Sequence, residues 1–214
     1  MRRVRRFAVR LARDTRGLAL LEFAFSVPIL LLLSLTGAEL LNYTTTRMRV
    51  SQMALQIADN AARMGKGTQI TAKVISETDI NDLFTGAQLQ SGELNLNANG
   101  RVILSDVEPV ANPNTTGKYK IAWQRCYGSK TTHSSSYGSS GDTDLAGVGP
   151  ANQQITAQDD NATMFVEVYY VYTPIIALSR APSTTMIEVA SMAVRDRRDL
   201  TQIYNTENAP IATC

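Results

Sequence analysis

Apolar residues dominate one long run near the start of the chain, from Leu18 to Leu41. As a helix these 24 residues are about 36 Å long at 1.5 Å per residue, and a bilayer core needs about 20 such residues. The run therefore predicts a membrane-spanning helix. Glu22 and Glu39 lie near its two ends, and an acid in a spanning segment is costly enough to indicate a function and a partner.

The next segment, 42–66, has the pattern of an amphipathic helix. Its apolar residues recur at spacings of three and four, which places them on one helical face, while arginine, glutamine and aspartate occupy the other. Gly65-Lys66-Gly67 then predicts a helix end. We expect one helix over 18–64, with Thr44-Thr45-Thr46 as its weakest point, because three β-branched residues lower helix propensity and could form a joint.

Residues 67–214 predict a domain of mixed helix and strand. Ser76, followed by Asp79 three positions later, is typical of a helix N-terminus and predicts a short helix over 76–84. β-Branched and aromatic runs then predict about four strands, with 164–173 as the central one. The fold class expected is α+β, with one long N-terminal helix packed on a small antiparallel sheet. The expected strands are 101–107, 119–124, 164–173 and 184–194.

Two features of this domain leave alternatives open. The segment 128–162 is dense in Ser, Thr, Gly, Asn and Asp and is too long for a tight hairpin, so it is either a partner-contacting loop or an insertion without a task. Cys126 and Cys214 either form one disulfide, as two cysteines on an exported domain often do, or remain unpaired thiols.

Charge is strongly segregated about the apolar run. Residues 1–16 carry seven arginines and one aspartate, or +6, whereas the whole chain carries +2 and residues 17–214 therefore −4. The positive-inside bias predicts a cytoplasmic leader and an exported remainder. Arginine-rich segments also bind phosphates, but beside a membrane span they normally set topology, so we expect no nucleic-acid partner.

The order of features is a basic leader, Gly17, four apolar residues, Glu22, an aromatic residue and the rest of the span. This order resembles the type IV prepilin signal, and more narrowly the TadE-like family of pseudopilins from Tad (Flp-type) pilus systems. The resemblance covers roughly residues 13–45. The residues that carry it are Gly17, Leu18, Glu22, Phe23, Pro28, Gly37 and Glu39.

The resemblance implies a pilin-like fold and a defined maturation. A prepilin peptidase would cut between Gly17 and Leu18, which removes the leader 1–17. Glu22 would then face the amine of a neighbouring subunit inside a bundle of N-terminal helices, where pairing offsets the cost of burying both charges. Phe23 and Glu39 would also serve assembly, and Pro28 would allow a local bend or melted turn.

No arrangement of residues predicts an enzyme or a cofactor. His133 is the only histidine and lies in a serine-rich segment without an orienting residue beside it. Asp159-Asp160 alone lacks the ligands that calcium requires. Neither a phosphate-binding glycine loop nor a metal-spaced cysteine cluster is present.

Three functions remain open. The first is a minor pseudopilin of a Tad pilus, with the prepilin peptidase, other pilins, the Tad inner-membrane assembly machinery and the lipid bilayer as partners. It would sit in the bacterial inner membrane with a cytoplasmic N-terminus and a periplasmic domain, and enter the extracellular pilus on assembly. The second is an anchored assembly factor outside the filament. The third is a secreted protein cut before Glu39, since Thr36 and Ala38 are small enough for ordinary signal peptidase.

Overall fold

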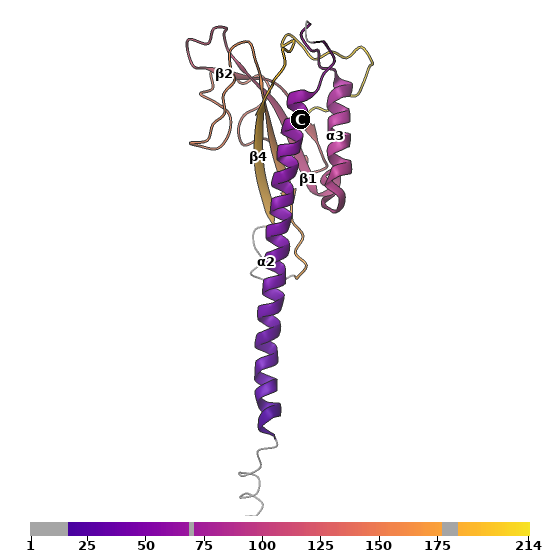
Figure 1. Cartoon of the computed structure of the whole chain (residues 1–214), viewed down its shortest axis with the longest axis vertical. Helices are drawn as coiled ribbons and strands as arrows, with labels where there is room; N and C mark the ends of the chain where they lie inside the picture. Colours follow the sequence, from indigo (N-terminus) through magenta and orange to yellow (C-terminus); the bar gives the residue numbers. More distant parts are fainter. Residues whose placement is uncertain (1–16, 69–70, 177–183) are drawn as a thin grey trace, which may run out of the picture.

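A single helix, α2 (Leu18–Arg63, 46 residues), runs the length of the molecule and carries the domain on its C-terminal half (Figure 1). The structure, a computed structural model, describes residues 17–68, 71–176 and 184–214, so the leader 1–16 lies outside the described residues. The expected long helix is confirmed to within one residue, and the three threonines do not interrupt it. It ends before Gly65, whose φ of 108° favours glycine.

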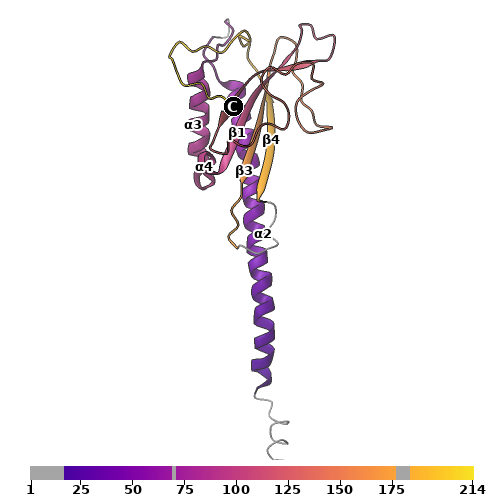
Figure 2. The same ribbon diagram turned by 180° about the vertical axis from the view of Figure 1, so that it is seen from behind.

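The domain is α+β, as predicted, with one four-stranded antiparallel sheet in the order β2-β1-β3-β4 (Figure 2). The predicted central strand is β3, which pairs with both β1 and β4. The elements after α2 are α3 (Glu77–Ser91), the 3₁₀ turn η1 (Gly92–Leu94), α4 (Leu96–Asn99), β1 (Gly100–Pro109), β2 (Tyr119–Tyr127), β3 (Thr163–Val171) and β4 (Thr185–Ala193).

Helix α3 begins as the sequence predicts but is about two turns longer than expected. Ser76 and Asp79 form the capping box, with the Ser76 hydroxyl accepting from the Asp79 backbone amide. The helix then continues past Gly86 to Ser91. It continues because Ile80, Phe84, Ala87 and Ser91 are all buried, so helical spacing of buried residues extends beyond the glycine.

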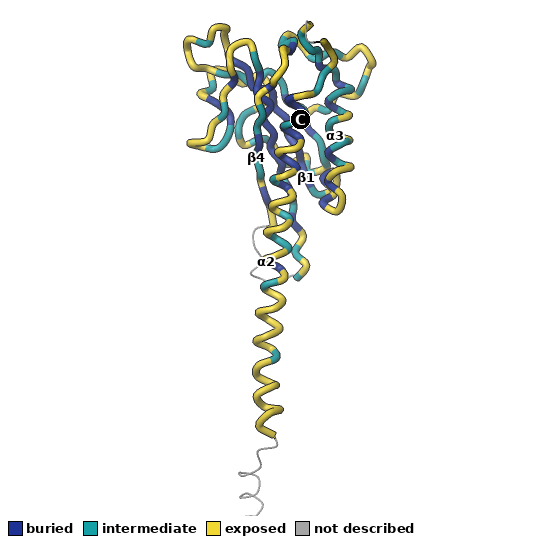
Figure 3. The backbone as a smooth tube through the Cα atoms, viewed as in Figure 1, coloured by how far each residue is buried: buried dark blue, intermediate teal, exposed yellow. Residues whose placement is uncertain are grey.

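The main core lies between the C-terminal half of α2 and the sheet. Val50, Ala54, Ile57, Ala58 and Ala61 are at most 1% exposed, and they face β3 and β4 while α3 flanks the helix. The alanines bring the helix axis close to the sheet because they add almost no side-chain volume. Figure 3 shows most of the buried residues of α2 on this upper half, while the lower half is almost entirely exposed.

The polar segment 128–162 covers the opposite face of the sheet and forms a third layer. Its Val148 packs with Phe165 of β3, whose side chain points away from α2 because strand residues alternate faces. Glu167 on the same face is fully buried. Its carboxylate accepts from His133 Nε2 at 2.8 Å and Ser135 Oγ at 2.8 Å. The segment therefore has a structural role that neither sequence interpretation anticipated.

Two buried titratable side chains, Arg198 and Asp106, interact near the C-terminal end of α2. Arg198 is 7% exposed, and its Nη2 donates to the carbonyls of Ala61, Ala62 and Met64 at 2.9–3.3 Å, which places positive charge at the negative end of the helix dipole. Asp106 on β1 is 1% exposed. Burial, and next the charge of Glu108, raises the pKa of Asp106 to about 8, although Arg198 opposes that shift.

This burial predicts a stability that falls with rising pH. The unfolded chain releases the Asp106 proton near pH 3.9, whereas the folded chain keeps it up to about pH 8. The folded state is therefore favoured most below pH 4 and loses up to about 1.4 kcal/mol per pH unit between these values. We expect the Tm of the full chain in detergent micelles to fall more steeply from pH 5 to pH 8 than that of Asp106→Asn. Parallel curves for the two proteins would contradict the assignment.

Candidate membrane anchor and its junction with the domain

The N-terminal half of α2 exposes apolar side chains on every side. Leu20, Phe25 and Leu33 are 70–76% exposed, and none of the residues in its most apolar window is buried. A helix that is apolar all round needs lipid or other helices as its surroundings. This part of α2 is long and apolar enough to cross a membrane.

Gly17 directly precedes α2 and is not required by the fold. Its φ of −84° suits any residue, and its carbonyl accepts the Leu21 amide at 3.1 Å. A Cβ at this position would meet no atom within 4 Å. Leu18, on the other side of the predicted cleavage bond, begins the helix and is 58% exposed. A substitution at Gly17 can therefore test processing without disturbing the structure.

Glu22 has no partner within the part of the chain that the structure describes. Its side chain is exposed one turn into α2, and neither a hydrogen bond nor an ion pair to a described residue satisfies it. The neighbouring Phe23 is 67% exposed. Both residues therefore face surroundings outside the described chain, and a carboxylate in a membrane-spanning helix would require a polar partner there.

Pro28 and Gly37 lie within an unbroken helix. α2 continues through Pro28, so the melted turn that the resemblance implies is not present in this structure. Proline removes one backbone donor, and membrane helices tolerate that loss where neighbours compensate. A Cβ on Gly37 would meet no other part of the chain within 4 Å, so this position faces open space in which another helix can approach.

Glu39, in contrast, finds its partners inside the same chain. Its side chain is buried, and one carboxylate oxygen accepts from Tyr172 Oη at 2.6 Å. The other oxygen accepts the backbone amides of Ile175 and Ile176 at 3.0 and 3.1 Å. The carboxylate is thus satisfied by the segment that follows β3, which fixes that segment against α2.

Tyr172 completes this junction. Its hydroxyl donates to Glu39 and accepts from Asn42 Nδ2 at 2.8 Å, while its ring meets Tyr43 edge-on at 5.3 Å between centroids. Burial, followed by the bond to Glu39, raises the pKa of Tyr172, so the hydroxyl keeps its proton and remains a donor. The Tyr172 hydroxyl and both oxygens of the Glu39 carboxylate are therefore paired.

The junction divides the predicted span into a free part and a docked part. Below Glu39, the segment 18–38 contains 21 residues and is about 31 Å long as a helix. That length matches a hydrocarbon core of about 30 Å. The membrane-spanning length available to α2 thus ends where the domain begins.

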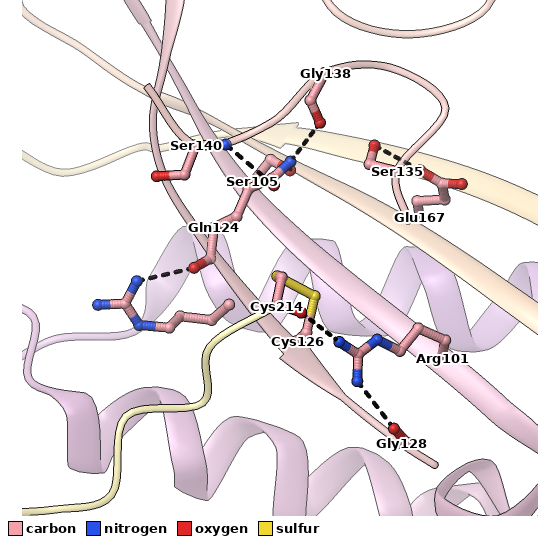
Figure 4. The surroundings of a disulfide bond; sticks show 11 residues. Arg101, Ser105, Gln124, Cys126, Gly128, Ser135, Gly138, Ser140, Glu167 and Cys214 are labelled. Atoms are coloured by element: carbon pink, nitrogen blue, oxygen red, sulfur yellow. Dashed lines mark hydrogen bonds between the residues drawn. A yellow bond between two sulfur atoms is a disulfide. The ribbon is translucent and has the colours of Figure 1, made fainter. Parts of the chain in front are cut away.

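A disulfide between Cys126 of β2 and Cys214 fixes the last residues of the chain to the sheet (Figure 4). The Cα atoms are 4.9 Å apart, and the Cys126 amide donates to the Ala212 carbonyl at 2.8 Å. Arg101 reinforces this attachment, because its guanidinium donates to the carbonyls of Gly128 and Cys214 at 3.0 and 3.3 Å. The bond crosslinks two segments 88 positions apart.

The arrangement around His133 does not form a nucleophile. His133 Nε2 and Ser135 Oγ each bond to a different oxygen of Glu167, so the described contacts do not direct the imidazole at the serine hydroxyl. The imidazole also stacks on Tyr169 at 4.2 Å between centroids. Among residues 17–68, 71–176 and 184–214, no group of three or more His, Cys, Asp or Glu side chains could hold a metal ion.

Sequence reasoning missed the partner of Glu39. It grouped this residue with those serving assembly, whereas the structure satisfies its carboxylate with Tyr172, 133 positions away. Tyr172 carried one usable signal, because it lies just before the strand-ending Pro174, where the chain must turn at the edge of the domain. No local pattern pairs it with Glu39.

Comparison of the chain with models of protein families, with curated proteins and with solved structures finds no match. The likeness to TadE-like pseudopilins thus rests on the residues named above and stays a prediction.

The junction predicts a measurable loss of stability in Tyr172→Phe. The variant leaves Glu39 and Asn42 without a shared partner, and breaking a buried hydrogen bond to a charged group costs about 1.5–3 kcal/mol. We expect thermal unfolding of the full chain in micelles to report a loss of that order. The matched control is Tyr43→Phe, which keeps the ring contact of the same junction and should cost much less. Equal losses of stability in the two variants would mean that the Tyr172 hydroxyl contributes no more than the Tyr43 hydroxyl.

Proposed function

We propose that this protein is a minor pseudopilin of a Tad-type pilus, cut by a prepilin peptidase between Gly17 and Leu18 and assembled through α2. The observation that carries the proposal is the exposed N-terminal half of α2, which combines apolar side chains on all sides with an acid, Glu22, that has no partner among the described residues. A helix that is apolar on all sides is stable only where lipid or other helices surround it.

The proposed role of Glu22 follows from the new N-terminus. After cleavage, Leu18 would carry a positive amine at the start of the helix, and Glu22 would be the fifth residue. In a bundle of such helices the carboxylate of one subunit meets the amine of the next, so each charge offsets the cost of burying the other. The pair would set the register between neighbouring subunits.

The domain supports the proposed location. A disulfide forms and persists in oxidising compartments, and the Cys126–Cys214 bond lies in the domain that the arginine-rich leader would direct outward. We therefore place the protein in the bacterial inner membrane before assembly, with a cytoplasmic N-terminus and a periplasmic domain. On assembly it would enter the extracellular filament.

One observation favours the pilus proposal over secretion by ordinary signal peptidase. A cut before Glu39 would fall inside the unbroken helix α2, at a residue whose side chain is fixed to the domain. Such a cut would separate the docked half of α2 from the free apolar segment 18–38, which the pilus proposal uses for assembly. An anchored assembly factor outside the filament has the same span, and the Glu22 experiment below distinguishes it.

Cleavage is tested by the variant Gly17→Val in a host with an active Tad system. We expect mature wild-type protein to begin at Leu18 and the variant to keep its leader and migrate more slowly on a gel. The fold offers no other reason for a shift, since a Cβ at position 17 would lie within 4 Å of none of the described residues beyond its chain neighbours. Gly37→Val is the matched control, because that glycine lies in equally open space, and it should be processed normally. A wild-type N-terminus at Met1 or Glu39 would refute the proposed processing.

Assembly is tested by Glu22→Ala. We expect normal cleavage and export but a large reduction of the subunit in sheared filaments, because its helix can no longer neutralise a neighbour's amine. Immunoblots of filament and membrane fractions measure the ratio. Ser26→Ala, another exposed polar position on the same helix whose hydroxyl bonds only to the Phe23 carbonyl, is the control and should assemble as wild type. Absence of the wild-type subunit from filaments would instead identify an assembly factor.

A further inference from the structure

We propose that the domain rests on the lipid surface through a membrane foot, defined as residues 172–176 together with Leu40 and Leu41 of α2. The proposal rests on the proposed membrane anchor and adds a second contact with the bilayer, made by the domain itself. The partner is the boundary between the hydrocarbon and the headgroups of the outer leaflet.

The first observation is the position of the foot. The segment after β3 descends along α2 and reaches the level of Glu39, below the end of α3 and the sheet (Figure 1). Its Ile175 and Ile176 amides bond directly to the Glu39 carboxylate. The foot thus lies at the upper end of the 21-residue free segment, where a bilayer around that segment would end.

The second observation is the composition of its surface. Ile175 is 69% exposed, and Leu40 and Leu41 are 51% and 70% exposed on the adjoining turn of the helix. Leu40 and Leu41 follow directly on the exposed apolar residues of the free segment. Exposed aliphatic groups of this kind gain free energy by entering a lipid boundary, at about 25 cal/mol per Å² of apolar surface removed from water.

The third observation is the satisfaction of polar groups. A loop at the edge of a bilayer cannot leave backbone amides unpaired, because lipid offers no acceptor. Glu39 accepts the backbone amides of Ile175 and Ile176, and Tyr172 donates to its other oxygen, so these donors and the carboxylate charge of the foot are all satisfied. Glu39 is thus a positioning residue that makes the foot compatible with lipid.

The next charged residues of α2 lie well above the foot. Arg47 and Arg49 are eight and ten positions after Glu39, which places them about 12 and 15 Å higher along the helix. Their side chains are 60% and 55% exposed. Headgroups extend about 5–8 Å beyond the hydrocarbon on each side, so both arginines lie beyond the headgroup layer, where they pair with Glu188 and Glu93 of the domain.

The test measures depth by electron paramagnetic resonance on the full chain in nanodiscs of phosphatidylethanolamine and phosphatidylglycerol. A nitroxide is attached to one added cysteine, with the native disulfide kept intact. Ile175→Cys reports the foot, and Ser34→Cys reports the span. Leu89→Cys on α3 is the matched control, because it is a similarly exposed apolar residue, 78% exposed, on a part of the domain above the foot.

We expect the ratio of accessibility to oxygen over a nickel chelate to be several-fold higher at 175 than at 89 and lower than at 34. A ratio at 175 equal to that at 89, with position 34 still in lipid, would overturn the foot and leave the anchor standing. A water-like ratio at 34 would overturn both. Low accessibility of position 175 to both reagents would show that a second copy covers it, and would also overturn the proposal.

The variant Glu39→Ala, combined with the label at 175, tests the positioning role separately. Loss of the carboxylate frees two amides, so we expect the ratio at 175 to fall toward the value at 89 while the label at 89 itself stays unchanged. Thermal unfolding confirms that the domain remains folded. An unchanged ratio at 175 would show that the foot reaches lipid without Glu39.

Discussion

The burial of one face of α2 against the sheet is the interaction on which the rest of the structure depends. Val50, Ala54 and Ile57, with the alanines between and after them, are almost completely inaccessible. Because α2 is one continuous helix, docking its C-terminal half also sets the direction in which the N-terminal half leaves the domain. The C-terminal half of α2 therefore forms part of the domain core, and its N-terminal half is a free apolar rod. The two halves share one continuous backbone and differ only in their side chains.

Polar contacts mark the two ends of this docked face. At the membrane-proximal end, the Glu39 carboxylate accepts from the segment after β3, and at the other end Arg198 donates to the last carbonyls of the helix. Each contact joins α2 to a segment more than 130 positions later in the chain. The apolar face between them supplies most of the burial, and the polar contacts fix its register, because displacement along the helix axis would leave buried charges unpaired.

The sequence predicted the features that have a local period. The apolar run, the amphipathic continuation, the stop at Gly65 and the four strands all follow from the spacing and type of neighbouring residues. The unpredicted features join distant positions: Glu39 with Tyr172, and Glu167 with the segment that carries His133. A polar residue in a strand or in a membrane span indicates that it needs a partner, but the sequence does not identify that partner. The third layer was missed for the same reason, since its few apolar residues are scattered through a polar segment.

The prediction that Thr44-Thr45-Thr46 could form a joint in the helix was wrong, and the contacts around these residues explain why. The Thr44 hydroxyl donates to the Leu40 and Leu41 carbonyls, so its polar group is satisfied within the helix. The triplet also lies between two fixed points, Glu39 below and Val50 above, and bending there would break both contacts at once. A force that moves the apolar rod, such as withdrawal from a bilayer, would therefore reach the domain through a stiff helix rather than being lost in a hinge.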